Sequence, residues 1–148
     1  RLDKISGILA QHSLRDAKPE KSLNMIRDHV IPKLKKHQAD ADADVYDLTA
    51  KSACSDFRII LERIVEFVLL NDVIVRFRRD VNTKGKLRGI TKVIAEDCDL
   101  IDALMTKYSV YEHSQSDELP LVPVELDEFE KDVLELIAWI NEFKTRIG

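Results

Sequence analysis

Hydrophobic side chains recur every three or four positions along most of this chain, which is the spacing of helices that bury one face. The longest such stretch covers about 46–71. Its apolar face comprises Phe57, Leu61, Ile64, Val65 and Val68. Glu62 and Glu66 fall on the opposite side. Arg58 lies one turn before Glu62, so these two can pair along the helix, or each can reach to another helix. The pattern predicts a long central helix, with Asp42 or Asp44 as its N-cap.

Helical spacing recurs on both sides of this central segment. Residues 23–34 keep it, although Pro32 should break or kink the run because a proline inside a helix removes a backbone hydrogen bond. The predicted helices after the centre cover 87–93, 94–111 and 125–146. Residues 73–77 are largely β-branched, but no partner strand is apparent, so we expect a short helix or turn. Trp139 lies off the apolar face of the last helix, which indicates a secondary contact or a partner surface.

These segments predict an all-α fold: a single-domain helical bundle of about five to six helices with a long central helix. Within it, residues 1–45 are an N-terminal helical segment that could be the end of a coiled coil, and 46–148 are a C-terminal helical bundle. The length of 148 residues suits one domain. Only four glycines and four prolines are present, which disfavours a turn-rich β architecture.

Composition narrows the classes of function. Hydrophobic residues make up 45% and charged residues 34%, as is typical of globular rather than disordered chains. No apolar run reaches the roughly 18 residues of a transmembrane helix. Cys54 and Cys98 are isolated, so we interpret them as structural thiols of a cytoplasmic protein. Phosphate-binding loops and metal motifs are missing, and we therefore predict no cofactor and no metal.

Positive charge is concentrated in one segment, although the chain as a whole carries a net charge of −4. Six basic residues fall within thirteen positions: Arg76, Arg78, Arg79, Lys84, Lys86 and Arg88. Such a cluster can contact nucleic-acid phosphates, but it is also compatible with an ordinary solvated face. These six residues are our candidates for binding a nucleic acid.

A second candidate group lies near the end of the predicted helix 94–111. Lys107, Ser109 and His113 stand close together, with Ser109 and His113 one turn apart. An imidazole at a helix end can serve as a general acid or base, and a lysine can steady a phosphate. The structural alternative is that His113 caps the helix or hydrogen-bonds a carboxylate.

A set of positions between Tyr46 and Arg146 carries a resemblance to a known family. They comprise Ser55-Asp56-Phe57-Arg58, Glu62-Arg63-Ile64-Val65-Glu66, Val68-Leu69-Leu70-Asn71, Arg76-Phe77, Thr83, Glu96-Asp97-Cys98, Ile101-Asp102, Met105-Thr106-Lys107, Ser109, His113, Pro123, Glu125-Leu126, Asp132 and Trp139. Through these positions the chain resembles the C-terminal segment of bacterial SMC/RecF-like ABC ATPases with coiled-coil arms, several of which are encoded in phage-defence or restriction-linked loci. The resemblance implies that the remainder of a longer ATPase chain is a partner of this module.

A weaker resemblance is to HEPN domains, helical bundles that often act as metal-independent RNases. An Arg-x-x-x-Glu helix, here Arg58 and Glu62, followed by a helix ending in His113 is similar to that arrangement. Lys107 stands where the HEPN motif has arginine, and Tyr108 departs from the expected polar residue. The resemblance implies that His113 would act at a ribose 2′-hydroxyl, with Lys107 or Arg58 at the phosphate.

Three functions follow as hypotheses. The chain is a non-catalytic C-terminal module of a coiled-coil ATPase for assembly or partner docking, a HEPN-like RNase effector, or a free-standing helical scaffold. The expected partners are a second copy in a homodimer and, for the RNase, RNA, with no membrane. The first hypothesis predicts an exposed apolar patch around Trp139 and the amino-terminal helix, with self-association that does not depend on His113. The second predicts RNA cleavage that depends on His113.

Overall fold

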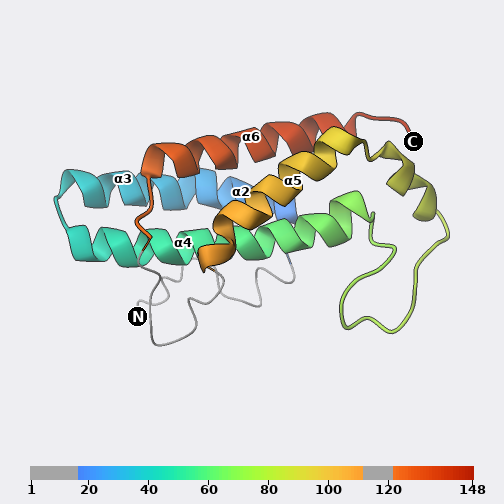
Figure 1. Ribbon diagram of the computed structural model, residues 1–148, viewed down its shortest axis with the longest axis horizontal. Helices are drawn as coiled ribbons and strands as arrows, with labels where there is room; N and C mark the ends of the chain where they lie inside the picture. The colour runs from blue at the N-terminus through green and yellow to red at the C-terminus, as the bar shows by residue number, and fades with distance from the viewer. Residues whose placement is uncertain (1–16, 112–121) are drawn as a thin grey trace.

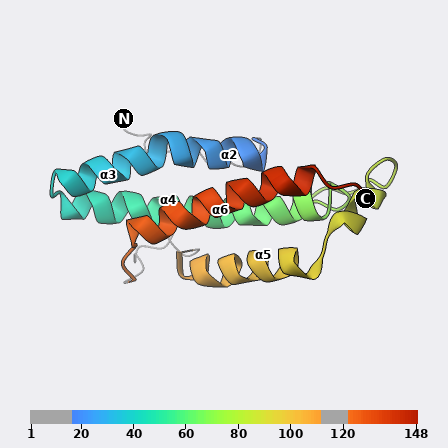
Figure 2. The same ribbon diagram turned by 90° about the horizontal axis from the view of Figure 1, so that it is seen from above.

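Helices stack in three layers along one long axis (Figures 1 and 2). The computed structural model describes residues 17–111 and 122–148. The α-helices in these ranges are α2 (Pro19–Met25), α3 (Ile31–Ala39), α4 (Ala43–Ile64), α5 (Ala95–Tyr108) and α6 (Leu126–Lys144). Figure 2 shows α2 and α3 on one side, α5 on the other, and α4 and α6 between them. No strand occurs in the described ranges, and the predicted all-α bundle is confirmed.

The central helix α4 supplies much of the core, as the sequence predicts. Its buried apolar side chains are Ala50, Ala53, Cys54, Phe57, Ile60, Leu61 and Ile64. Asp42 caps its start by accepting a hydrogen bond from the Val45 N–H at 3.4 Å. A π-helical turn, Val65–Leu69, extends the helix. The chain then turns away at Asn71 and Asp72, whose φ angles of 49° and 64° are left-handed.

Pro32 does not break the helical run before α4, but the turn that precedes it departs from regular α-helical geometry. A π-helical turn, Ile26–Val30, precedes it, and α3 begins at Ile31. The Ile31 N–H donates to the Ile26 carbonyl in this wider turn. Pro32 thus falls in the first turn of α3, where a residue without an N–H is tolerated.

Three aromatic rings join the layers at the middle of the bundle. Phe57 of α4 packs edge-on against Tyr108 of α5 and Phe129 of α6, with ring centroids 4.8 and 5.6 Å away. Edge-to-face packing at this separation is favourable beyond the area it buries. Leu23 and Leu34, from α2 and α3, are fully buried in the same core. The segment 19–39 therefore shares one core with the helices that follow.

One buried carboxylate ties the start of α5 to the end of α6. Asp97 accepts the Ile94 N–H at 2.8 Å, the Trp139 indole N–H at 2.8 Å and two bonds from the Arg146 guanidinium at 2.7 and 3.0 Å. Arg146 also pairs with Glu142. We call these five residues the Asp97 cluster. Trp139 therefore makes a secondary contact within the chain, which was one of the two alternatives that the sequence left open.

Candidate functional site

The predicted acid–base group lies where α5 ends and a 3₁₀ turn, Ser109–Tyr111, begins. The structure describes Lys107 and Ser109, whereas His113 lies outside the described residues. Ser109 Oγ donates to the Thr106 carbonyl at 2.8 Å, which is a local bond at a helix end. Of the two described candidates, Lys107 is the one whose side chain bonds another helix.

Lys107 forms ion pairs with two carboxylates of α6. Its Nζ lies 2.7 Å from Asp132 Oδ2 and 2.9 Å from Glu128 Oε2, and the Tyr108 hydroxyl donates to the same Asp132 oxygen at 2.6 Å. Burial would lower the pKa of Lys107, but the bonds to Asp132 and Glu128 outweigh it and raise the pKa. The lysine is therefore charged, and its charge is already balanced inside the protein.

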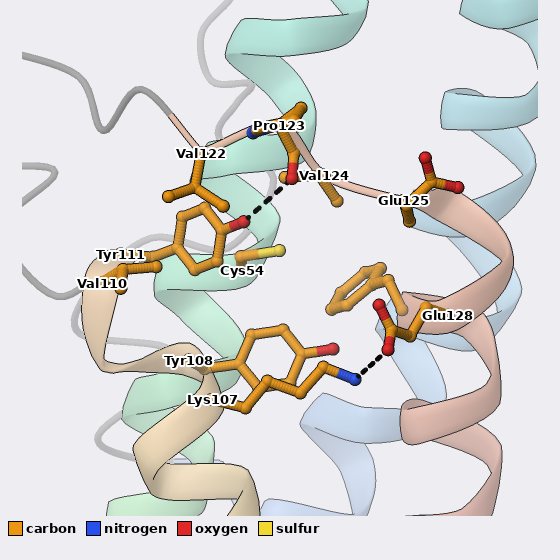
Figure 3. Close-up of a pocket in the computed structure, with 11 residues that line it drawn as sticks. Cys54, Lys107, Tyr108, Val110, Tyr111, Val122, Pro123, Val124, Glu125 and Glu128 are labelled. Carbon is orange, nitrogen blue, oxygen red and sulfur yellow. Dashed lines mark hydrogen bonds and ion pairs between the residues drawn. The ribbon is translucent and has the colours of Figure 1, made fainter.

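A pocket of about 180 Å³ lies beside this lysine, between the middle of α4 at Cys54, the end of α5 and the chain entering α6 (Figure 3). Burial raises the pKa of the Cys54 thiol, and it raises the pKa of Tyr111 to about 12. Neither side chain ionises at neutral pH, so neither is a ready nucleophile or base. The volume is below the range of about 300–1,000 Å³ of typical ligand pockets.

Two further candidate residues, Arg58 and Glu62, lie on α4. Arg58 Nη1 lies 2.8 Å from Glu62 Oε2, so the pairing along the helix is confirmed. The same nitrogen contacts Met105 Sδ of α5 at 3.1 Å. Lys107, in contrast, is directed to Glu128 of α6 (Figure 3). Arg58 therefore contacts Glu62 and Met105, whereas Lys107 contacts Glu128 and Asp132.

The predicted nucleic-acid residues all lie between α4 and α5, in a segment that projects beyond the end of α4 (Figure 1). We call residues 71–94 the basic loop. Arg76 binds Glu66 through its backbone N–H at 2.8 Å and its Nε at 3.0 Å, and it also pairs with Glu62. Glu66 is 7% exposed, so its predicted position on a polar face is wrong. A side chain accepting two hydrogen bonds can be buried there.

Two other basic side chains of this loop also have internal partners. Arg78 pairs with Asp72 at 2.6 Å and donates to the carbonyls of Asp72 and Val73. Lys86 Nζ is 3.9 Å from Asp72. Much of the charge in the cluster therefore holds the loop together.

Three basic side chains remain available on the loop. Arg79, Lys84 and Arg88 are exposed, and none of them forms an ion pair with another residue of the described ranges. Arg88 Nε also donates to the main-chain oxygen of Gly148 at 3.3 Å. These three carry the charge that a partner would meet.

Phe77 is the residue that sequence reasoning missed. It is 101% exposed, and its φ of 68° is left-handed, which is unfavourable for a side chain of this size. Ile74, Val81 and Leu87 of the same loop are 55%, 60% and 53% exposed. The available signal was an aromatic residue flanked by arginines in a segment without helical spacing. Apolar and basic groups share this surface.

No group of three or more His, Cys, Asp or Glu side chains in the described ranges could hold a metal ion. Among the helices of those ranges, none is long and apolar enough to cross a bilayer. The fold and the site thus define an all-α helical bundle with a small pocket and an exposed basic loop. Comparisons with models of protein families, with curated proteins and with solved structures find no match.

Proposed function

We propose that this chain is a non-catalytic helical module of a bacterial coiled-coil ATPase that docks partners or assists assembly, in the cytoplasm and in defence against phage. The observation that carries the proposal is the basic loop, which exposes Phe77 together with Arg79, Lys84 and Arg88, three basic residues without an ion pair in the described ranges. Exposed aromatic and arginine side chains are enriched at protein interfaces. The resemblance of residues 46–146 to ATPase C-terminal segments supplies the larger context.

The ion pairs formed by the described catalytic candidates also support a non-catalytic module. Lys107 is balanced by Asp132 and Glu128, and Arg58 is paired with Glu62. A phosphate approaching either cation would have to displace a carboxylate, which costs binding energy. The pocket beside Lys107 offers no thiolate or phenolate at neutral pH.

The ATPase part of the proposal is tested first on the gene. The sequence encoded before Arg1 should contain a Gly-x-x-x-x-Gly-Lys-Ser/Thr loop followed by long heptads. The intact protein is then purified with wild-type Phe77 or with Phe77→Gly, and its assembly is compared by light scattering. Leu134→Ser, which changes an exposed apolar residue of α6, is the matched control. Loss of assembly in Phe77→Gly alone supports docking through the loop.

The competing RNase hypothesis makes an opposite prediction for the same protein. End-labelled RNA incubated with it in the presence of a chelator should remain intact if the module is non-catalytic. Metal-independent cleavage that disappears in a folded His113→Ala variant would overturn our proposal. A start codon directly before Arg1 would remove the ATPase context.

A further inference from the structure

The basic loop presents Phe77 on a fixed scaffold. Asn71 Nδ2 donates to the Lys86 carbonyl at 2.7 Å, and the Asn82 N–H donates to the Val73 carbonyl at 2.9 Å, so both bonds cross the loop. Arg78 and Glu66 bind other parts of it. A preorganised loop loses less conformational entropy on binding than a disordered one.

Charge is distributed very unevenly between this loop and the rest of the chain. Residues 71–94 contain seven Lys or Arg against two Asp, a net charge of +5, whereas the whole chain carries −4. The remainder of the same chain is therefore strongly acidic. A surface that complements the basic loop is consequently present on every copy of this protein.

The nearest such surface is the outer face of α5, which begins where the loop ends. Glu96, Asp99 and Asp102 are exposed there at helical spacing. None of the three forms an ion pair within the described ranges. We call these residues the α5 acidic face. Figure 2 shows the loop and the start of α5 at the same end of the bundle.

Adjacent patches of opposite charge form a self-complementary surface. When two copies are related by a two-fold axis, the basic patch of each can meet the acidic patch of the other, so every contact occurs twice. A standard interface needs about 20–30 residues from each partner. The exposed residues of the loop and of the neighbouring α5 acidic face would contribute to such an interface.

We propose that a second copy of this chain is the partner of the basic loop: Phe77, Arg79 and Lys84 of one protomer pack against Glu96, Asp99 and Asp102 of the other, and reciprocally. This inference rests on the proposed docking function and names its partner and surface. Phe77 and the other exposed apolar residues of the loop supply the area removed from water. The charges set the orientation and the salt dependence.

Charge reversal tests the interface. Arg79→Glu and Asp99→Arg are purified separately, and their mass is measured by light scattering over a range of protein concentrations. Each variant alone places like charges together and should raise the dimer dissociation constant at least tenfold. In a mixture, the introduced glutamate of one variant would face the introduced arginine of the other, and the unchanged Arg79 would face the unchanged Asp99. The mixture should therefore form a heterodimer near the wild-type affinity.

Matched controls separate this interface from general charge effects. Lys33→Glu on α3 and Glu135→Arg on α6 reverse exposed charges elsewhere and should leave the dimer unchanged. Phe77→Gly should weaken association at high salt as well as at low salt, because its contribution is apolar. Circular dichroism confirms that each variant is folded.

Several results would overturn the inference. Wild-type protein that stays monomeric, or a mixture that fails to dimerise, removes the second copy as the partner. Binding of a single-stranded 20-nucleotide probe that Arg79→Glu abolishes, with the protein still monomeric, would assign the loop to nucleic acid. In both cases the docking function survives if the intact ATPase still needs Phe77 to assemble, whereas RNA cleavage dependent on His113 would end both proposals.

Discussion

The Asp97 cluster and the basic loop meet at Ile94, at one end of the bundle, and they use charge in opposite ways. Asp97 is 1% exposed and accepts four hydrogen bonds, so every charge around it is matched. In the loop, Phe77 is fully exposed, and Arg79 lacks an ion-pair partner within the described ranges. Buried polar groups whose hydrogen bonds are all formed stabilise the fold. Exposed charged or apolar groups that have no partner in the described chain remain free to bind another molecule. Mutations should therefore separate stability from association.

The largest effect should come from Asp97→Ala. Removal of the carboxylate leaves the Arg146 guanidinium and the Trp139 indole without their buried partner. Breaking a buried pair by deleting one member costs about 3–5 kcal/mol. Urea unfolding should show this loss, and Glu135→Ala, at an exposed carboxylate of α6 outside the proposed interface, should change stability by no more than about 0.5 kcal/mol. Similar losses in the free energy of unfolding for the two variants would contradict the expected difference between a buried and an exposed carboxylate.

Trp139→Phe should have a smaller effect on the same cluster. The ring is retained in approximate shape, but the N–H that donates to Asp97 at 2.8 Å is lost. A hydrogen bond to a charged group contributes about 1.5–3 kcal/mol. The double variant Asp97→Ala/Trp139→Phe should lose less than the sum of the single variants, because both changes remove the same bond. Additive losses would show that the indole acts independently.

Acid should weaken the Asp97 cluster selectively. Burial favours a higher pKa for Asp97, but hydrogen bonds from Arg146, Ile94 and Trp139 outweigh it and lower the pKa below its ordinary value. The folded state thus binds this proton less readily than the unfolded state. Its contribution to stability is complete above the unfolded pKa of about 3.9 and is lost as the pH falls through the lower folded pKa.

The measurement is the free energy of unfolding of wild type and Asp97→Ala from about pH 6 to pH 2. The difference between the two proteins should be constant above about pH 5 and should shrink in acid. A difference that grows as the pH falls would contradict the lowered pKa of Asp97.

Phe77→Gly should have the smallest effect on stability. The side chain is fully exposed and the φ of 68° suits glycine, so relief of backbone strain offsets the greater freedom of an unfolded glycine. The free energy of unfolding should stay the same or rise by up to about 1 kcal/mol. Thermal unfolding checks this value, and a loss above about 1 kcal/mol would show that Phe77 packs within the fold.

The sequence by itself determined the helices and most of the core. On α6, predicted for residues 125–146, the apolar positions Leu126, Phe129, Val133, Leu136, Ile140 and Phe143 are buried as their spacing predicts. The pairing of Arg58 with Glu62 was predictable for the same reason. Both depend on residues three or four apart on one helix, and helical geometry alone fixes such neighbours.

Only the tertiary structure decided which polar groups are matched. Lys107 meets Asp132, and Asp97 meets Arg146, across 25 and 49 positions of the chain. The predicted role of Lys107 could not anticipate Asp132 as its partner, because no local spacing encodes a contact between helices. Phe77 was ambiguous for the same reason, since a hydrophobic residue in a loop is buried or exposed according to what packs over it. Local periodicity determines the helices, and long-range packing determines which charges and apolar groups remain for a partner.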